Sequence, residues 1–202
     1  MRTVPKILMI FRLLLAPLSI ILSCHYGERC VPMLILILCL GLTSDILDGI
    51  IARKYQVATE NLRRMDSFID IIFWLSLATS TVIVRPGIIE ANLIFIVGLV
   101  ILEGINALIS FLRFRKEAST HAYSSKFWGI TLFLALISIL GFNYGGFFLY
   151  LTIIVGYISY VDVLLILILL PHWMHDIPSF FHAYLIRKKI NLKKSTLGSV
   201  TN

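Results

Sequence analysis

The chain has 202 residues, of which 58% are hydrophobic and 14% charged, with a net charge of +7 and a mean hydropathy of +0.91. This composition excludes an ordinary soluble domain and allows several membrane-spanning helices of about 20 residues each. In a soluble protein the positive charge would suggest a nucleic-acid partner. In a membrane protein it instead marks cytoplasmic loops and contact with anionic lipid, so no nucleic acid is expected.

The N-terminal segment is predicted to be a basic interfacial lead-in over residues 1–6 that continues into a first span over residues 7–23. This apolar run is long enough to span the membrane rather than to be removed as a signal peptide. Arg12 interrupts the run and is expected either to snorkel to the surface or to face a functional site. Cys24 and Cys30 flank the next connection and could pair on an oxidising side, with packed free thiols as the alternative.

Five more spans are predicted along the chain, over residues 31–53, 65–84, 88–112, 127–140 and 147–170. Arg85-Pro86-Gly87 has the composition of a turn, and the glycine-rich connection over residues 141–146 is short enough to make the last two spans antiparallel neighbours. The sequence therefore predicts an all-α integral membrane bundle of six transmembrane helices, which forms one domain over residues 1–202.

The distribution of Lys and Arg predicts the orientation. All of these residues except Arg29 and Arg85 fall in segments on one predicted face of the membrane, so both termini are expected in the cytoplasm. The basic tail, residues 171–202, is expected to lie on anionic headgroups. Three residues of this tail have the spacing of a metal site, namely His172, His175 and Asp176. An aromatic, histidine-rich segment beside a membrane more simply lies at the interface.

Isolated polar residues also occur within the spans. Glu103 and Asn106 lie three residues apart in the fourth span, and Asp162 lies in the sixth. Hydrogen bonding between helices is favoured over a direct substrate role, because polar groups inside a membrane bundle commonly join helices.

Four aspartates are concentrated at the adjoining ends of the second and third spans, namely Asp45, Asp48, Asp66 and Asp70. Residues three or four apart share a helix face, so two such helices side by side would form a four-carboxylate cluster. Ionisable residues at membrane depth point to function. The bare carboxylates would repel one another, whereas one or two Mg²⁺ or Mn²⁺ ions would neutralise them.

Residues next to the first aspartate pair suit a phosphorylated ligand. Gly49 and Ala52 leave space for a bulky ligand to approach the backbone, and Arg53 adds a planar cation. A metal ion and an arginine beside small residues indicate a diphosphate site on the cytoplasmic face.

The aspartates and their neighbours resemble the pattern D-x2-D-G-x2-A-R-x8-G-x3-D-x3-D of the CDP-alcohol phosphotransferases, integral membrane enzymes of phospholipid synthesis. The matching residues are Asp45, Asp48, Gly49, Ala52, Arg53, Asp66 and Asp70. The second glycine of the pattern is replaced by Leu62. The first span also partly resembles the lead-in P-N-x-L-T-x-x-R of the family branch that uses glycerophosphate or makes cardiolipin, with Lys6 and Met9 in place of Asn and Thr.

The resemblance implies transfer of a phosphatidyl group from CDP-diacylglycerol to an alcohol, with release of CMP, in a homodimer. It implies metal ligands at all four aspartates and a general base at Asp70. The implied CDP contacts are Asp45, Gly49, Ala52, Arg53 and the position of Leu62. Lys126 resembles the lysine that precedes the fifth span in the family, and with Arg113 it is assigned to a phosphate-bearing acceptor.

The acceptor expected from the lead-in and the clustered cations is glycerol 3-phosphate, followed by phosphatidylglycerol or an inositol compound. Two other functions remain open. One is a family member that has lost activity, for which Leu62 is the support. The other is a carboxylate-lined ion transporter, which would not need the residues from Gly49 to Arg53 and would usually show repeat symmetry or broken helices.

Overall fold

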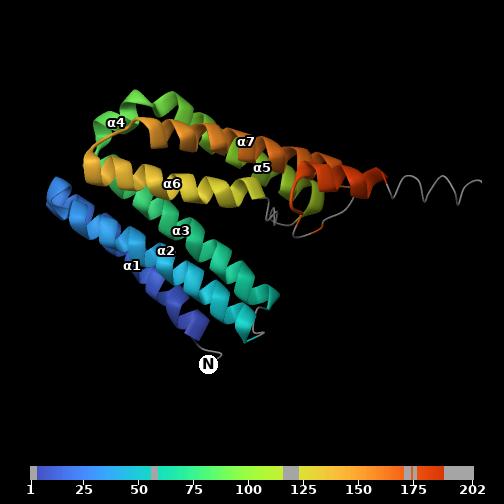
Figure 1. The fold of residues 1–202 in the computed structure, drawn as a ribbon, viewed down its shortest axis with the longest axis horizontal. Coiled ribbons are helices and arrows are strands. Elements are labelled where there is room, and N and C mark those ends of the chain that lie inside the picture. Colours follow the sequence, from blue (N-terminus) through green and yellow to red (C-terminus); the bar gives the residue numbers. More distant parts are fainter. Residues whose placement is uncertain (1–3, 56–58, 116–122, 171–173, 175–176, 189–202) are drawn as a thin grey trace, which may run out of the picture. The chain divides into compact units, whose positions relative to one another are not determined.

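The computed structural model describes residues 4–55, 59–115, 123–170, 174 and 177–188, and in these residues every regular element is a helix (Figure 1). The elements are α1 (Val4–Tyr26), the short 3₁₀ helix η1 (Gly27–Cys30), α2 (Val31–Lys54), α3 (Glu60–Val84), α4 (Pro86–Ala91), α5 (Leu93–Phe114), α6 (Tyr123–Phe142) and α7 (Phe147–Leu169). Residues 180–188 are also helical. The all-α prediction is confirmed for this part of the chain.

The chain divides into two compact units, and α6 runs from one into the other. The first unit comprises residues 1–91 and 136–145, and the second comprises residues 92–135 and 146–202. The single domain expected over the whole chain stays a prediction.

Within the described residues, five stretches are long and apolar enough to cross a membrane, namely Val4–Ala52, Met65–Val84, Leu93–Phe114, Ser124–Phe142 and Phe147–Leu169. The first has 49 residues and contains both α1 and α2, which pack against each other on either side of η1. These stretches support an integral membrane protein. The count of six separate spans and the cytoplasmic placement of the termini stay predictions.

The predicted fourth span, residues 88–112, is divided in the structure. Arg85 leaves helical geometry after α3 (φ −129°, ψ 55°), and Pro86 begins α4 at the first helical position, where its missing N–H has no helical partner to lose. Asn92 then leaves helical geometry again (φ −118°, ψ 12°) before α5. The expectation of one continuous helix was wrong, because the buried Asn92 interrupts the helix near the start of this span.

In the first unit, α1 packs against both α2 and α3, and Figure 1 shows the three helices side by side. Small side chains allow this close contact. Ser19 and Ser80 are fully buried, and the Ser80 hydroxyl donates to the Ser19 hydroxyl at 3.2 Å. Gly41 on α2 faces the buried ring of Phe73 on α3, where any Cβ would overlap the ring. The close packing holds the end of α2 and the start of α3 in one unit with α1.

The turn between α1 and α2 depends on Gly27, whose φ of 53° is rarely adopted by residues with a side chain. Cys30 follows and is buried in a hydrophobic cluster with Val31, Leu34, Val84 and Leu140. Cys24 is exposed, and all three cysteines are free thiols. The alternative of a Cys24–Cys30 disulfide is therefore not realised in this structure.

In the second unit, α7 packs against α5 and contacts the first half of α6. The Ser124 hydroxyl donates to Asp162 at 2.8 Å, and the hydroxyls of Ser125 and Ser159 lie 3.0 Å apart. Residue numbers thus rise along α6 as they fall along α7. This is the antiparallel arrangement that the short glycine-rich connection predicted.

Two of the three polar side chains considered in the spans, Asn106 and Asp162, join helices in the second unit, as expected. The buried Asn106 donates to the carbonyl oxygen of Tyr160 at 3.1 Å. Asp162 accepts from the backbone N–H of Phe180 at 3.0 Å, where helix 180–188 begins, and a carboxylate is favourable at that end of a helix. Glu103 is exposed on α5.

Helix 180–188 packs on the end of α7 through a hydrophobic cluster that contains Ile166, Leu170, Ile177 and Ala183. Its exposed residues include the aromatic Phe180, Phe181 and Tyr184 and the basic Arg187 and Lys188. The possible metal residues of the tail, His172, His175 and Asp176, lie outside the described residues, as does the basic segment from residue 189 onwards.

Candidate active site

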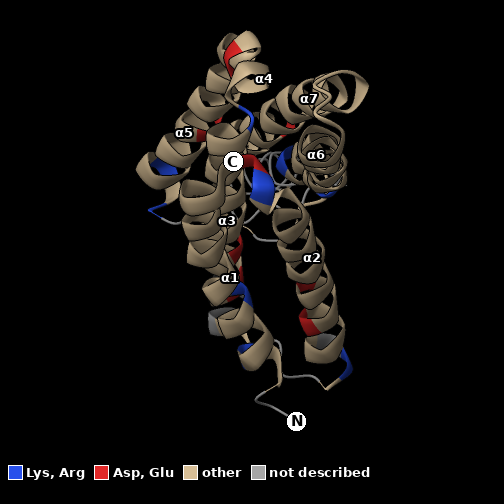
Figure 2. Cartoon of the chain, turned by 90° about the vertical axis from the view of Figure 1, so that its left-hand side faces the viewer, with Lys and Arg blue, Asp and Glu red and all other residues tan. Residues whose placement is uncertain are grey.

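Four aspartates from two helices lie together in the first unit. Asp45 and Asp48 lie in the last turns of α2, and Asp66 and Asp70 lie in the first turns of α3. Carboxylate oxygens of Asp45, Asp48 and Asp66 lie within 4.8 Å of one another. Figure 2 shows acidic segments, in red, on α2 and α3 toward the end of the unit where α1 begins. We refer to Asp45, Asp48, Asp66 and Asp70 as the carboxylate cluster.

The start of α3 determines which of its turns carry carboxylates. Thr59 has extended backbone geometry (φ −77°, ψ 158°), and its hydroxyl accepts from the backbone N–H of Leu62 at 3.2 Å. A threonine in this position satisfies one of the N–H groups that have no partner at a helix start. This N-cap sets the first turn of α3 and so directs Asp66 and Asp70 toward α2.

Arg12 of α1 lies at the centre of the carboxylate cluster. Its side chain is 1% exposed, and its guanidinium pairs with Asp48 and Asp70, with Asp45 at 3.1 Å, and with Asp66 at 3.3 Å. Its Nε also donates to the Ser44 hydroxyl at 3.4 Å. Sequence reasoning left Arg12 between two roles and did not place it among the site residues. The signal was present, since a buried arginine in an apolar span needs an anionic partner.

The cluster is open on one side. The Asp48 side chain is 2% exposed, whereas those of Asp66 and Asp70 are 29% and 28% exposed and that of Asp45 is 40% exposed. A ligand can therefore reach three of the carboxylates from outside the unit. Asp48 forms the closed bottom of the cluster, next to Arg12.

The carboxylate cluster fits a hard divalent cation. Its donors are all carboxylate oxygens, which Mg²⁺ and Mn²⁺ prefer over softer ligands. The oxygens of Asp45, Asp48 and Asp66 are close enough to bind one ion together. Among the side chains that the structure describes, four carboxylates surround one arginine, and a divalent ion would reduce this excess of negative charge.

The chain matches a known protein family. A family described as CDP-alcohol phosphatidyltransferase matches residues 2–175 of the chain. The chain belongs to this family. Comparison with curated proteins and with solved structures gives no match.

A CDP-alcohol phosphatidyltransferase moves a phosphatidyl group from a CDP-alcohol to an acceptor. Members of the family are membrane proteins and use divalent metals. The chain is therefore a transferase of phospholipid synthesis. The matched region contains every residue of the carboxylate cluster and Arg12. The predicted resemblance to the family is confirmed, whereas its branch stays a prediction.

The glycine position of the transferase pattern, Leu62, is buried with an exposed fraction of 8%. It lies in a hydrophobic cluster with Met9, Ala52 and Ile69, one residue from each of α1 and α2 and one from its own helix. Met9 and Leu62, two departures from the family patterns, thus belong to the same cluster. The space expected beside Ala52 is covered in this structure, because Ala52 is only 9% exposed. Nucleotide contacts at Ala52 and Leu62 stay predictions.

Two further residues expected to contact the nucleotide are only partly described. Gly49 lies one residue beyond Asp48 and is half-buried. The backbone of Arg53 belongs to α2, but its side chain lies outside the part that the structure describes.

The residues assigned to the acceptor belong to the second unit, whereas the carboxylate cluster belongs to the first. The Arg113 guanidinium donates to the carbonyl oxygens of Leu167 and Ile168, at 2.7 Å each, at the end of α7. Lys126 is exposed in the first turn of α6. Their role with the acceptor stays a prediction, and Arg113 has a second, structural use as a cap for carbonyls at a helix end.

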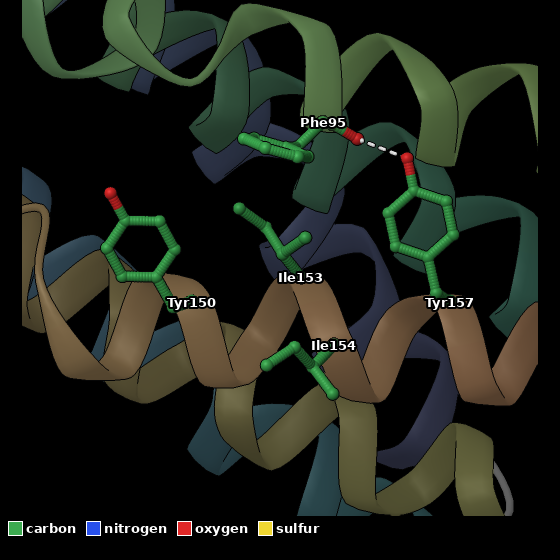
Figure 3. Close-up of a pocket in the computed structure, with 5 residues that line it drawn as sticks. All are labelled: Phe95, Tyr150, Ile153, Ile154 and Tyr157. Atoms are coloured by element: carbon green, nitrogen blue, oxygen red, sulfur yellow. Dashed lines mark hydrogen bonds between the residues drawn. The ribbon is translucent and has the colours of Figure 1, made fainter.

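An apolar cleft in the second unit offers no comparable chemistry. It is lined by Phe95, Tyr150, Ile153, Ile154 and Tyr157, which Figure 3 shows between α5 and α7. The Tyr157 hydroxyl donates to the carbonyl oxygen of Phe95 at 3.1 Å. The lining has no carboxylate or basic side chain, so the carboxylate cluster is the better candidate for phosphate chemistry.

Proposed function

We propose that this transferase moves the phosphatidyl group of CDP-diacylglycerol to glycerol 3-phosphate and releases CMP. The observation that carries the proposal is the carboxylate cluster, which lies at the end of α2 and the start of α3 in a member of the CDP-alcohol phosphatidyltransferase family. The lead-in over residues 5–12 and the cations between α5 and α6 favour glycerol 3-phosphate as acceptor. Phosphatidylglycerol or an inositol compound is the alternative acceptor.

One or two Mg²⁺ or Mn²⁺ ions would be held by Asp45, Asp48 and Asp66, with Asp70 completing the set. A bound ion of this kind offsets the charge of the diphosphate and of the departing CMP. Asp48 is the most enclosed of the ligands, so it would anchor the ion at the bottom of the cluster.

Asp70 is proposed as the general base. Its partly exposed carboxylate would accept the proton of the acceptor hydroxyl, whose oxygen then forms a bond to the phosphorus next to the lipid. The bond between that phosphorus and the bridging oxygen breaks, and the electron pair leaves with CMP. Gly49, Ala52, Arg53 and Leu62 are proposed to border the nucleotide.

A purified preparation in lipid nanodiscs tests the acceptor directly. With CDP-diacylglycerol as the only donor and Mg²⁺ present, CMP release is measured with glycerol 3-phosphate, phosphatidylglycerol or inositol added in turn. We expect the fastest release with glycerol 3-phosphate. A faster rate with either other acceptor would replace the proposed one, and no release with any acceptor would favour loss of activity.

The orientation of the protein is a separate expectation from its Lys and Arg distribution. We propose that both termini and the carboxylate cluster face the cytoplasm and that the protein is a homodimer. Single cysteines introduced at Glu60 and Ser195, in a cysteine-free background, should react with a membrane-impermeant maleimide only from the cytoplasmic side. A cysteine at Gly87 should react only from the other side. Labelling of the Glu60 position from outside would contradict the orientation.

A further inference from the structure

Arg12 and a divalent ion would bind the same carboxylates. Nη1 of Arg12 contacts Oδ1 of Asp45, Asp66 and Asp70, and Nη2 contacts Oδ2 of Asp48. The set that could hold an ion is Asp45, Asp48 and Asp66. A Mg²⁺ ion binds its oxygen ligands at about 2.0–2.1 Å, so an oxygen that coordinates the ion has no room for a guanidinium nitrogen on the same side.

The charge of the site also indicates that Arg12 and a divalent ion serve the same role. Arg12 is a buried cation among four carboxylates, and it pairs with the most enclosed of them, Asp48, at the bottom of the cluster. Buried carboxylates without a cation are strongly destabilising. Arg12 therefore stabilises the metal-free cluster, and a divalent ion would take over that role.

The geometry also allows Arg12 to move. Three of its four partners, Asp45, Asp66 and Asp70, are partly exposed on the open side of the cluster. A long, flexible arginine side chain can give up these outer contacts by rotation about its own bonds, without displacement of α1.

We infer that Arg12 is an exchangeable internal cation, which holds the carboxylate cluster when no divalent ion is bound and withdraws from the shared carboxylates when one binds. The inference rests on the proposed function only for the identity of the ion. Arg12 is in this sense a positioning residue, because it acts on the site through the metal ligands. By thermodynamic linkage, a cation that the ion must displace lowers the affinity for that ion.

Binding of Mn²⁺ alone to the full-length protein in nanodiscs tests the inference without turnover. Free Mn²⁺ is measured by electron paramagnetic resonance for the wild type and for Arg12→Gln, which removes the charge and keeps a polar side chain. We expect Arg12→Gln to bind Mn²⁺ at least about fivefold more tightly, as the removal of a competing group requires. Its melting temperature in chelator should fall below that of the wild type, and Mn²⁺ should raise it by a larger increment.

Two matched variants control this comparison. Arg12→Lys keeps the charge but lacks the planar fork, and it should give an Mn²⁺ affinity between those of the wild type and Arg12→Gln. Arg85→Gln removes an arginine of the first unit that is 14% exposed and pairs with Glu28 at 2.6 Å, and it should leave Mn²⁺ affinity unchanged. Weaker or unchanged Mn²⁺ binding by Arg12→Gln would overturn the inference.

A measurement on the wild type keeps the inference testable if Arg12→Gln fails to fold. Phenylglyoxal modifies exposed guanidinium groups, and the modified residues are identified by mass spectrometry. Arg12 should react slowly in chelator, where it is 1% exposed, and several times faster with saturating Mn²⁺. An Arg12 rate that does not change with bound Mn²⁺ would contradict the exchange. A protein that shows the exchange but releases no CMP would refute the proposed function alone.

Discussion

Replacement of Asp48 by asparagine is expected to lower the rate of CMP release more than about a hundredfold, since even outer partners of metal ligands typically cost 10–100-fold when removed. Asparagine has nearly the same shape, and Arg12 keeps Asp45, Asp66 and Asp70 as partners, so the helices should remain packed. Asp66→Asn should have a similar effect. The rate is measured in nanodiscs with saturating donor and acceptor.

Asp162→Asn provides a matched control for these variants. Asp162 is also an aspartate in an apolar helix, but its partners are the Ser124 hydroxyl and the backbone N–H of Phe180. Its replacement should lower the melting temperature with little change in metal dependence. Full turnover of the wild type in excess chelator, or a wild-type rate for Asp48→Asn, would exclude a metal-dependent mechanism at this cluster.

Leu62→Ala is expected to destabilise the protein by about 2 kcal/mol or more, as large-to-small substitutions in packed clusters do. Leu62 is buried with Met9, Ala52 and Ile69, so the shorter side chain leaves a gap between α1, α2 and α3. Leu62→Met conserves volume and should stay within about 1.5 kcal/mol of the wild type. The stabilities of the wild type, Leu62→Ala and Leu62→Met are compared by thermal unfolding under the same conditions.

Leu62→Gly tests whether the nucleotide borders Leu62. Removal of the side chain would uncover Ala52, and if the nucleotide borders this surface, the donor KM should fall while the metal dependence is unchanged. Restoration of transfer in Leu62→Gly from an inactive wild type would support loss of activity. An unchanged donor KM would place the nucleotide away from Leu62.

The carboxylate cluster could be predicted from sequence because its information is local. Asp45 with Asp48, and Asp66 with Asp70, have helical spacing, and both pairs fall where two apolar runs adjoin. The approximate positions of the long helices followed from the same apolar runs, and the end of α3 followed from Arg85-Pro86. Asn92 was missed, because a single asparagine in an apolar run is more often a polar residue of a continuous span than a break.

The contacts of Arg12 and of Leu62 could not be predicted, because both depend on how distant helices pack. Arg12 lies far before the aspartates in the chain, and the apolar run around it does not show which face points toward α2 and α3. Met9 and Leu62 appeared as two separate departures from family patterns, whereas the structure places them in one cluster. Arg113 appeared as a candidate anion ligand, but its bonds to carbonyls at the end of α7 require the tertiary structure.

The order of Arg12 and its partners along the chain has a consequence for membrane insertion. Arg12 is synthesised before any of the four aspartates, so a cation is already present when α2 and then α3 leave the ribosome. Paired charges cost less in a low-dielectric environment than separate ones. Each acidic helix would therefore meet its counter-charge on arrival, and the bilayer would not have to accommodate Asp48 as an isolated anion at any stage of assembly.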